Sequence, residues 1–259
     1  ETFSVIEDES LGVTGSDPFP STAVSPAGAH GVLAGAFGYA RSATQVTADG
    51  SLFAGSVGAD EQDHPYSFAI TDVHGQAFDG ADSGLKTLSN ETIWLTTDGN
   101  GVLVGAATGQ DPAFKVYVDA DGYVWIAQYA PIRNDIAGDS AAAYDDAVHI
   151  TPDLLHITAT LTDFDGDSVT QISPIALDIQ FQDDGPKAND DTAPTSLGGA
   201  PVIVDVAAND QAGTDGVDWS NASGTAVSNT DPAHGSVVYN GNGTFTYTPT
   251  AGYEGDDGA

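Results

Sequence analysis

Three aspartates spaced two residues apart form the clearest chemical pattern in the sequence. Asp163, Asp165 and Asp167 surround a glycine, Gly166. Carboxylates at positions i, i+2 and i+4 can curl onto one hard cation, and Ca²⁺ takes about six to eight oxygen ligands. The alternative is an acidic hairpin turn that binds no metal. Because so acidic a chain needs positive charge to compensate it, we favour calcium at these three residues.

A shorter pattern of the same kind ends in Asp121 and Gly122. Asp119 and Asp121 are two residues apart, so both are candidate calcium ligands. The Asp-Gly dipeptide tolerates positive φ and is typical of hairpin turns. A plain turn is therefore favoured over a metal site at this position.

Oxygen-bearing side chains also crowd the stretch around Pro186. Carboxylates so close together repel one another unless a cation bridges them. We therefore expect a joint made rigid by calcium, with a solvated flexible linker as the alternative. The candidate ligands are Glu9, Asp183, Asp184, Asn189, Asp190 and Asp191.

Aromatic residues alternate along 123–129. Tyr123, Trp125, Ala127 and Tyr129 share one face of the expected strand, where core packing is favoured. An open face would instead be a binding platform, and would favour carbohydrate stacking on Trp125. Arg133 is a candidate for holding a ligand carboxylate through charge-assisted hydrogen bonds, with a role in surface solubility as the alternative.

The long loops, which include residues 12–31 and 132–146, are the expected place for ligand binding on a rigid β-scaffold. With Tyr129 and Arg133, the candidate ligand-binding residues there are Asn134, Asp135, Asp139, Asp145 and Asp146.

The charge balance limits the partners of the chain. Its 259 residues include 38 acidic and 5 basic ones, a formal net charge of −33, yet 40% are hydrophobic, enough for a core. A folded domain with this charge repels itself, so bound divalent cations or a salt-rich medium are expected. Nucleic acid and anionic membranes are poor partners. The sequence contains no cysteine and therefore no disulfide.

No pattern of catalytic residues is evident. The six histidines are scattered without metal-ligand spacing, and neither a nucleophile elbow nor a phosphate-binding loop is present. Acidic pairs that could hydrolyse glycosides are too common in this chain to be informative. We therefore expect a protein that is not an enzyme.

The elements that must position these residues are strands. Segments rich in Val, Ile, Thr and aromatics occur at 114–118, 123–129, 150–161, 169–181, 202–206, 235–239 and 244–248. Asp-Gly and Asn-Gly turns separate them, and only 140–147 has a short helical pattern. The prediction is an all-β, calcium-stabilised β-sandwich with long loops.

A change of pattern near Pro186 predicts two domains, a β-sandwich at 1–186 and a second unit at 187–259. The second unit is shorter than a sandwich of about 100 residues. We therefore expect a partial Ig-like or cadherin-like module.

Taken as a set, several motifs give a family resemblance. The segments VIEDESLG (5–12), DADG (119–122), AQYA (127–130), LTDFDGD (161–167) and FQDDGP (181–186) resemble repeat domains of type I-secreted RTX adhesins. The segments ANDD (188–191), VDVAAND (204–210), AHGSV (233–237) and NGTFTYTP (242–249) resemble bacterial cadherin-like (VCBS-type) extender modules.

This resemblance implies an extracellular place on the bacterial cell surface, type I secretion, calcium-driven folding, and a role in cell adhesion and biofilm formation. Some domains similar to residues 1–186 bind peptide C-termini through calcium, whereas others are plain extenders. The expected function is calcium-dependent binding of a peptide or protein on another cell surface. The alternatives are a calcium-rigidified extender and a carbohydrate-binding lectin module.

Overall fold

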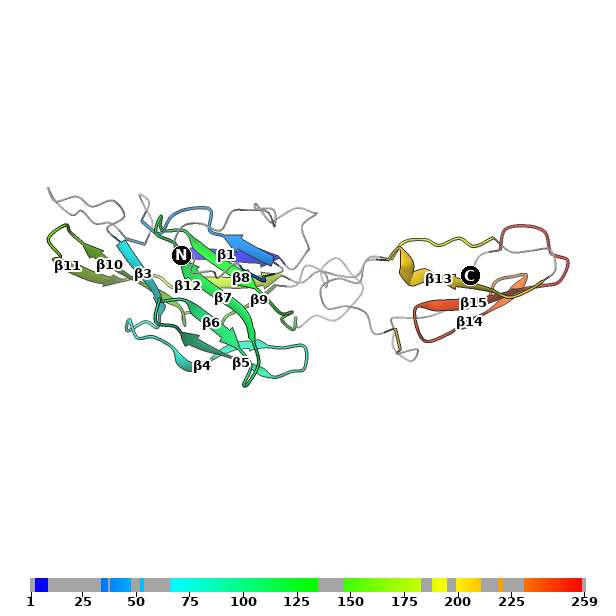
Figure 1. Cartoon of the computed structure of the whole chain (residues 1–259), viewed down its shortest axis with the longest axis horizontal. Helices are drawn as coiled ribbons and strands as arrows, with labels where there is room; N and C mark the ends of the chain where they lie inside the picture. Colours follow the sequence, from blue (N-terminus) through cyan, green and yellow to red (C-terminus); the bar gives the residue numbers. More distant parts are fainter. Residues whose placement is uncertain are drawn as a thin grey trace. The chain divides into compact units, whose positions relative to one another are not determined.

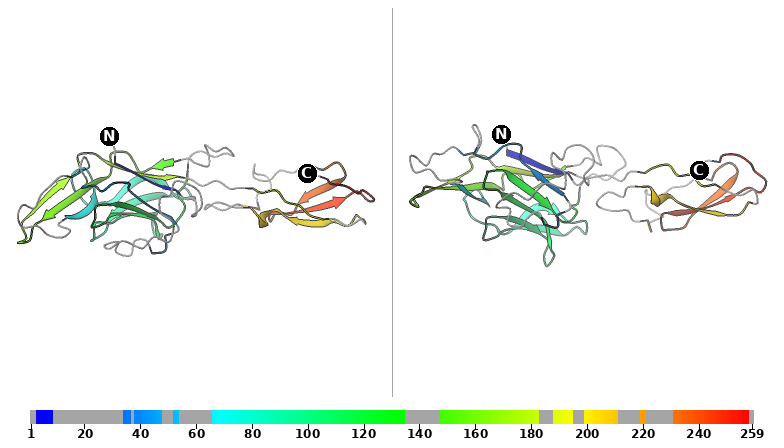
Figure 2. Two further views of the ribbon diagram at one scale, coloured as in Figure 1. Left: turned by 90° about the horizontal axis from the view of Figure 1, so that it is seen from above. Right: turned by 45° about the horizontal axis from the view of Figure 1, so that its top comes forward.

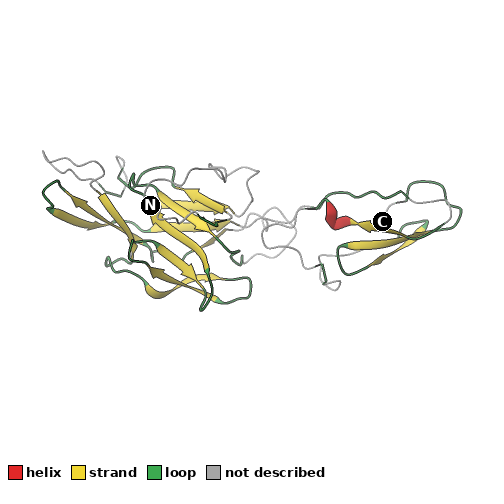
Figure 3. Ribbon diagram, viewed as in Figure 1, coloured by secondary structure: helices red, strands yellow, loops and turns green. Residues whose placement is uncertain are grey.

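The computed structural model describes residues 3–8, 34–36, 38–47, 52–53, 66–134, 147–182, 188–194, 199–210, 219–220 and 231–257. Their secondary structure is almost entirely strand, which confirms the predicted all-β class (Figure 3). By its internal contacts the chain divides into two compact units, Glu1–Asp184 (unit 1) and Gly185–Ala259 (unit 2).

One layer of unit 1 is a six-stranded sheet in the order β2-β8-β7-β6-β5-β4, with every neighbouring pair antiparallel (Figure 1). Short connections join β4 through β8, so this part of the sheet is a meander. Its strands are β2 (Gly38–Arg41), β4 (Asp79–Lys86), β5 (Thr92–Thr97), β6 (Leu103–Ala106), β7 (Pro112–Val118) and β8 (Val124–Gln128).

Two three-stranded sheets, β1-β12-β9 and β11-β10-β3, form the opposing layer. β1 runs parallel to β12, and β10 pairs antiparallel with both β3 and β11. The β10–β11 hairpin lies at one end of unit 1 (Figures 1 and 2). The strands are β1 (Phe3–Asp8), β3 (Tyr66–Thr71), β9 (Ala147–His149), β10 (His156–Thr162), β11 (Ser168–Ile172) and β12 (Leu177–Gln182).

The core of unit 1 fills the space between these layers. In β5 and β12 every second residue is apolar and buried, for example Ile93 and Leu95 opposite Ile179 and Phe181. This alternation puts one face of each strand into the core, as a two-layer sandwich requires. The six-stranded sheet buries a second, smaller cluster on its outer face: Tyr39, Val102, Tyr117, Trp125 and Ala127.

Four turns of unit 1 share one hydrogen-bond pattern in the sequence Asp-x-x-Gly-x. In each, the aspartate and the fifth residue pair through their backbones, the glycine has positive φ, and the aspartate Oδ1 accepts from the fifth amide. Glycine is favoured there because it adopts positive φ without steric cost. The turns are 72–76, 98–102, 119–123 and 163–167, each named here by its first residue.

Two long segments predicted as single strands are interrupted. The prediction for 150–161 is wrong at its start, because Leu154 N–H donates to Thr151 in a turn and β10 begins only at His156. The prediction for 169–181 is wrong in the middle, since residues 173–176 separate β11 from β12. Backbone bonds such as Leu177 N–H to Leu155 O then link the two sheets of this layer. Most of the short helical pattern at 140–147 lies outside the described residues.

The described part of unit 2 is an antiparallel sheet in the order β13-β15-β14. Its elements are β13 (Val202–Asp205), the 3₁₀ turn η1 (Val206–Ala208), β14 (Gly235–Tyr239) and β15 (Thr244–Pro249). These strands match the predicted segments closely. Tyr247 covers Gly235, where an added Cβ would lie 2.3 Å from the ring.

Candidate functional site

The Asp163 turn joins β10 to β11 and brings three carboxylates together. Oxygens of Asp163, Asp165 and Asp167 lie within 4.8 Å of one another. Asp163 is half-buried, whereas the other two are exposed. The structure thus brings the three residues of the strongest sequence motif into one cluster.

The carboxylate oxygens of this cluster could together bind a hard cation. Asp163 Oδ1 accepts from the amides of Gly166 and Asp167, at 3.1 and 2.8 Å. Within the described part of the chain, no donor bonds to the carboxylates of Asp165 and Asp167. Ca–O distances of about 2.3–2.6 Å allow two oxygens on one ion to be roughly 5 Å apart. The donor set therefore suits Ca²⁺, with water completing the shell.

A comparison of the four Asp turns separates turn geometry from metal chemistry. The aspartate and the glycine recur in all of them, so the fold alone accounts for Asp163 and Gly166. The third position is His74, Asn100 or Asp121 in the other turns, and the fifth is Gln76, Val102 or Tyr123. Carboxylates at both the third and the fifth positions occur only in the Asp163 turn among these four, and the turn does not need them.

The Asp119 turn is built differently at its carboxylate. Asp119 is only 2% exposed; its Oδ1 accepts from Tyr123 N–H at 2.9 Å and its Oδ2 from Trp125 Nε1–H at 2.7 Å. Asp121 is exposed, and Gln45 donates to its backbone carbonyl. Protein donors thus occupy both oxygens of Asp119, which favours the plain turn. Calcium binding by Asp119 and Asp121 stays a prediction.

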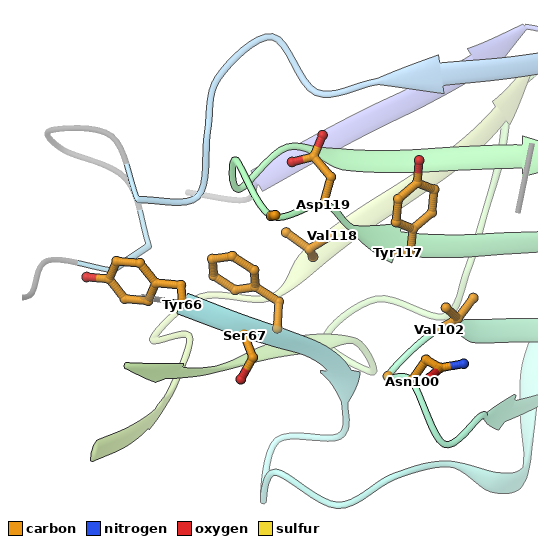
Figure 4. Close-up of a pocket in the computed structure, with 10 residues that line it drawn as sticks. Tyr66, Ser67, Asn100, Val102, Tyr117, Val118 and Asp119 are labelled. Atoms are coloured by element: carbon orange, nitrogen blue, oxygen red, sulfur yellow. The ribbon is translucent and has the colours of Figure 1, made fainter. Parts of the chain in front are cut away.

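A pocket of about 180 Å³ lies close to the Asp163 turn. Figure 4 shows Tyr66 and Ser67 of β3 on one side and Val118 and Asp119 on the other. The Asp98 turn closes it, because Gly101 O accepts from Ile70 N–H of β3. Tyr66 pairs with Leu161, two residues before Asp163, so the pocket and the acidic cluster lie at the same end of unit 1.

The predicted ligand-binding residues are spread out. Arg133 is exposed and its Nη1 donates to Asn90 Oδ1 at 3.2 Å, whereas Tyr129 lies on the outer face beside Lys115. Asn134 follows Arg133 and is half-buried. Asp135, Asp139, Asp145 and Asp146 lie outside the described residues. Ligand binding by all of these residues stays a prediction.

The predicted shared face of Tyr123, Trp125, Ala127 and Tyr129 is confirmed, and it packs in the outer-face cluster. Trp125 is 4% exposed, with Tyr117 stacked at 6.4 Å between ring centroids. The open platform that would favour carbohydrate binding at Trp125 is therefore not present.

Of the calcium ligands predicted at the junction, the structure describes some and not others. Glu9, Asp183 and Asp184 lie outside them. In unit 2, Asn189 donates from its backbone to Asp210 Oδ1 at 2.8 Å and from its side chain to Asn209 O at 2.6 Å. Asn209 returns a bond to Asp190 O. These bonds fix the segment that carries Asp190 and Asp191, whose calcium binding stays a prediction.

Sequence reasoning missed two features. The Asp72 and Asp98 turns repeat the spacing of the Asp163 turn, and a search for Asp-x-x-Gly would have found all four. The second feature is Lys115, which lies beside an open pocket with Tyr129. A lysine within an otherwise apolar strand is a weak signal, and only the fold shows what surrounds it.

Comparisons with known proteins give the family. Residues 8–176 match the family model described as Domain of unknown function (DUF5801), and residues 183–259 match the model described as Bacterial Ig domain. No curated protein and no solved structure matches the chain. Among the described residues, no helix is long and apolar enough to cross a membrane. Ig-like all-β domains are typically structural, and bacterial ones occur in surface or extracellular proteins. The chain therefore belongs to the DUF5801 family and carries a bacterial Ig-like domain after its DUF5801 domain.

Proposed function

We propose that this chain is an extracellular region of a large bacterial surface adhesin, in which unit 1 binds a ligand in a calcium-dependent way. The ligand is a peptide or protein on another cell surface, and the outcome is attachment and biofilm formation. The Ig-like match at 183–259 and the resemblance of 1–186 to RTX adhesin repeats support this setting. Type I secretion and the non-enzymatic role rest on the same resemblance.

The observation that carries the proposal is the carboxylate cluster of Asp163, Asp165 and Asp167. Two of these carboxylates have no role in the turn, yet they stand close to a third in a chain of net charge −33. Like charges this close destabilise the hairpin unless a cation joins them. Calcium would supply that charge and hold the β10–β11 hairpin in one conformation.

Calcium binding would also act on the neighbouring pocket. β10 pairs with β3, and Tyr66 and Ser67 of β3 line the pocket. Ordering the Asp163 turn therefore orders the strand that forms one pocket wall. In addition, a bound cation lowers the negative potential that would otherwise repel an anionic peptide terminus.

The test is capture of peptides with free C-termini from a library, in millimolar calcium and again in chelator. We expect a restricted set to be captured only in calcium, and Asp165→Asn combined with Asp167→Asn to abolish capture. The matched control combines Asp79→Asn with Asp153→Asn, which removes the same two charges from exposed positions of unit 1 outside the cluster and the pocket. No capture by folded protein, or equal capture in chelator, would contradict the proposal.

A calcium-rigidified extender is the second candidate, and the bacterial Ig match favours it. Here the ions would bind at the junction, with Asp190 and Asp191 among the ligands. Small-angle scattering of the whole chain tests this candidate. A maximum dimension that is longer and better defined in calcium than in chelator, without any peptide capture, would select it.

A further inference from the structure

The outer face of the six-stranded sheet carries a second pocket, open to solvent and about 750 Å³ in volume. It lies where β7 begins and β8 ends, with Lys115 and Tyr129 in its wall. The other lining residues are Gly109, Gln110, Asp111, Pro112 and Ala130. The chain has only five basic residues, so a lysine in a pocket wall is a rare positive charge that could bind an anionic ligand.

Among the described residues, neither the Lys115 ammonium nor the Tyr129 hydroxyl has an acceptor. The half-buried Lys115 ammonium instead lies over the Tyr129 ring, 5.3 Å from its centroid. The Tyr129 hydroxyl is buried and has no hydrogen-bond partner. A buried hydroxyl and a partly desolvated ammonium are both costly without partners.

The tyrosine is held in its donor form. Burial raises the pKa of Tyr129 to about 12, so its hydroxyl keeps its proton at physiological pH. Lys115 and Tyr129 both line the pocket, and neither of these polar groups bonds to Asp111, the carboxylate of the lining, or to another described residue. An anionic oxygen ligand satisfies both.

We propose that Lys115 and Tyr129 form a binding site for an organic carboxylate, with Pro112 and Ala130 receiving the apolar carbon skeleton of the ligand. Asp111 is the one carboxylate in the pocket lining, and it is exposed, so water screens its repulsion. The face of Tyr129 toward Lys115 is already covered by the ammonium, which disfavours sugar stacking there.

This inference goes beyond the proposed function because the site does not need calcium. Pro112 begins β7 and Lys115 is its middle residue, whereas Val118 at its end borders the pocket near the Asp163 turn. The two pockets therefore border different parts of one strand. A binding test in chelator measures the Lys115 site without any calcium-dependent binding.

The experiment follows the backbone amide signals of the whole chain by NMR in chelator, during titration with N-acetyl-leucine. The matched probe is N-acetyl-leucinamide, which has the same skeleton without the charge. We expect saturable shifts at Gly109, Lys115 and Tyr129 with the acid, and none with the amide. Equal shifts with both probes, or none with the acid, would overturn the proposal. Galacturonate, a sugar that also carries a carboxylate, tests whether the ligand is a sugar acid. Stronger binding of galacturonate than of N-acetyl-leucine would contradict the apolar carbon skeleton proposed for the ligand.

Variants give the residue-level test. Lys115→Gln and Tyr129→Phe should each weaken binding of the acid about ten-fold, as the loss of one hydrogen bond to a charged group does. Asp111→Asn should strengthen it. The controls are Lys86→Gln, whose ammonium instead donates to Thr92 at 2.6 Å, and Tyr253→Phe, which removes a hydroxyl from unit 2. A loss with the controls equal to that with Lys115→Gln would contradict the site.

Discussion

Trp125 donates its indole N–H to Asp119 Oδ2 at 2.7 Å, and this bond joins a turn to the aromatic cluster of the outer face. The other oxygen of Asp119 accepts from Tyr123 N–H. A fully buried carboxylate with two protein donors is part of the scaffold. The bond therefore assigns Asp119 a structural role that does not depend on an ion.

Asp119→Asn tests this role. An amide offers one oxygen for two donors, so either Tyr123 N–H or the Trp125 indole loses its acceptor. We expect a loss of about 1–3 kcal/mol in the free energy of unfolding. Urea denaturation followed by tryptophan fluorescence measures it. The loss should be equal in calcium and in chelator, whereas a loss confined to calcium would identify Asp119 as a metal ligand.

The Asp163 turn should separate two roles within one loop. Asp163→Ala removes the acceptor of two turn amides, which should cost about 1 kcal/mol in chelator. It also removes one carboxylate of the calcium cluster, so its loss should be larger in calcium. Asp165→Asn with Asp167→Asn keeps the turn and should lower the melting temperature only in calcium. Thermal denaturation with and without chelator gives both results.

The Asp98 turn supplies the control for this comparison. Asp98 accepts from the amides of Asn100 and Val102, as Asp163 does in its own turn. Asp98→Ala should therefore lower the melting temperature equally in both conditions. A calcium-dependent loss at Asp98, or equal losses for the Asp165 and Asp167 double variant in both conditions, would remove the calcium site from the Asp163 turn.

The predictable strands were those with strong local signals. β7, β8, β14 and β15 carry β-branched and aromatic residues with clear turn signals, and the sequence located them. β4 has the sequence DGADSGLK, with low β-propensity, and it forms a strand because β5 pairs with it despite register shifts. That pairing depends on residues outside β4, so the pattern of apolar and polar residues within β4 does not predict the strand.

The same limit applies to the site. Asp163, Asp165 and Asp167 are close in sequence, so their convergence could be predicted. Lys115 and Tyr129 meet only because β7 and β8 pair in one register, with Lys115 opposite Ala127. Arg133 and Tyr129 are both predicted ligand-binding residues, yet the backbone of Arg133 pairs with Lys86 and its side chain with Asn90.

Close packing against Gly105 gives a prediction about the core. A Cβ at this position of β6 would lie 2.3 Å from the Phe114 ring, which is fully buried and cannot move aside. Gly105→Ala should therefore cost about 1–3 kcal/mol by overpacking. Gly99→Ala is the control, because nothing lies within 4 Å of its Cβ, and it should change stability by less than about 0.5 kcal/mol. Guanidinium denaturation of both variants measures the two changes in the free energy of unfolding.

The pair of Asp178 and His149 predicts a pH dependence in acid. Burial alone would raise the pKa of Asp178, but hydrogen bonds from His149, Gln180 and Ser4 outweigh it and hold the pKa below 3.8. A carboxyl group whose pKa is lowered by folding stabilises the native state above its unfolded pKa, and that stability is lost as the pH falls through the folded value. Asp178→Asn should therefore flatten the decline of stability below about pH 4. Urea midpoints from pH 7 to pH 3 measure the difference, and parallel curves for variant and native chain would show that the pair contributes nothing.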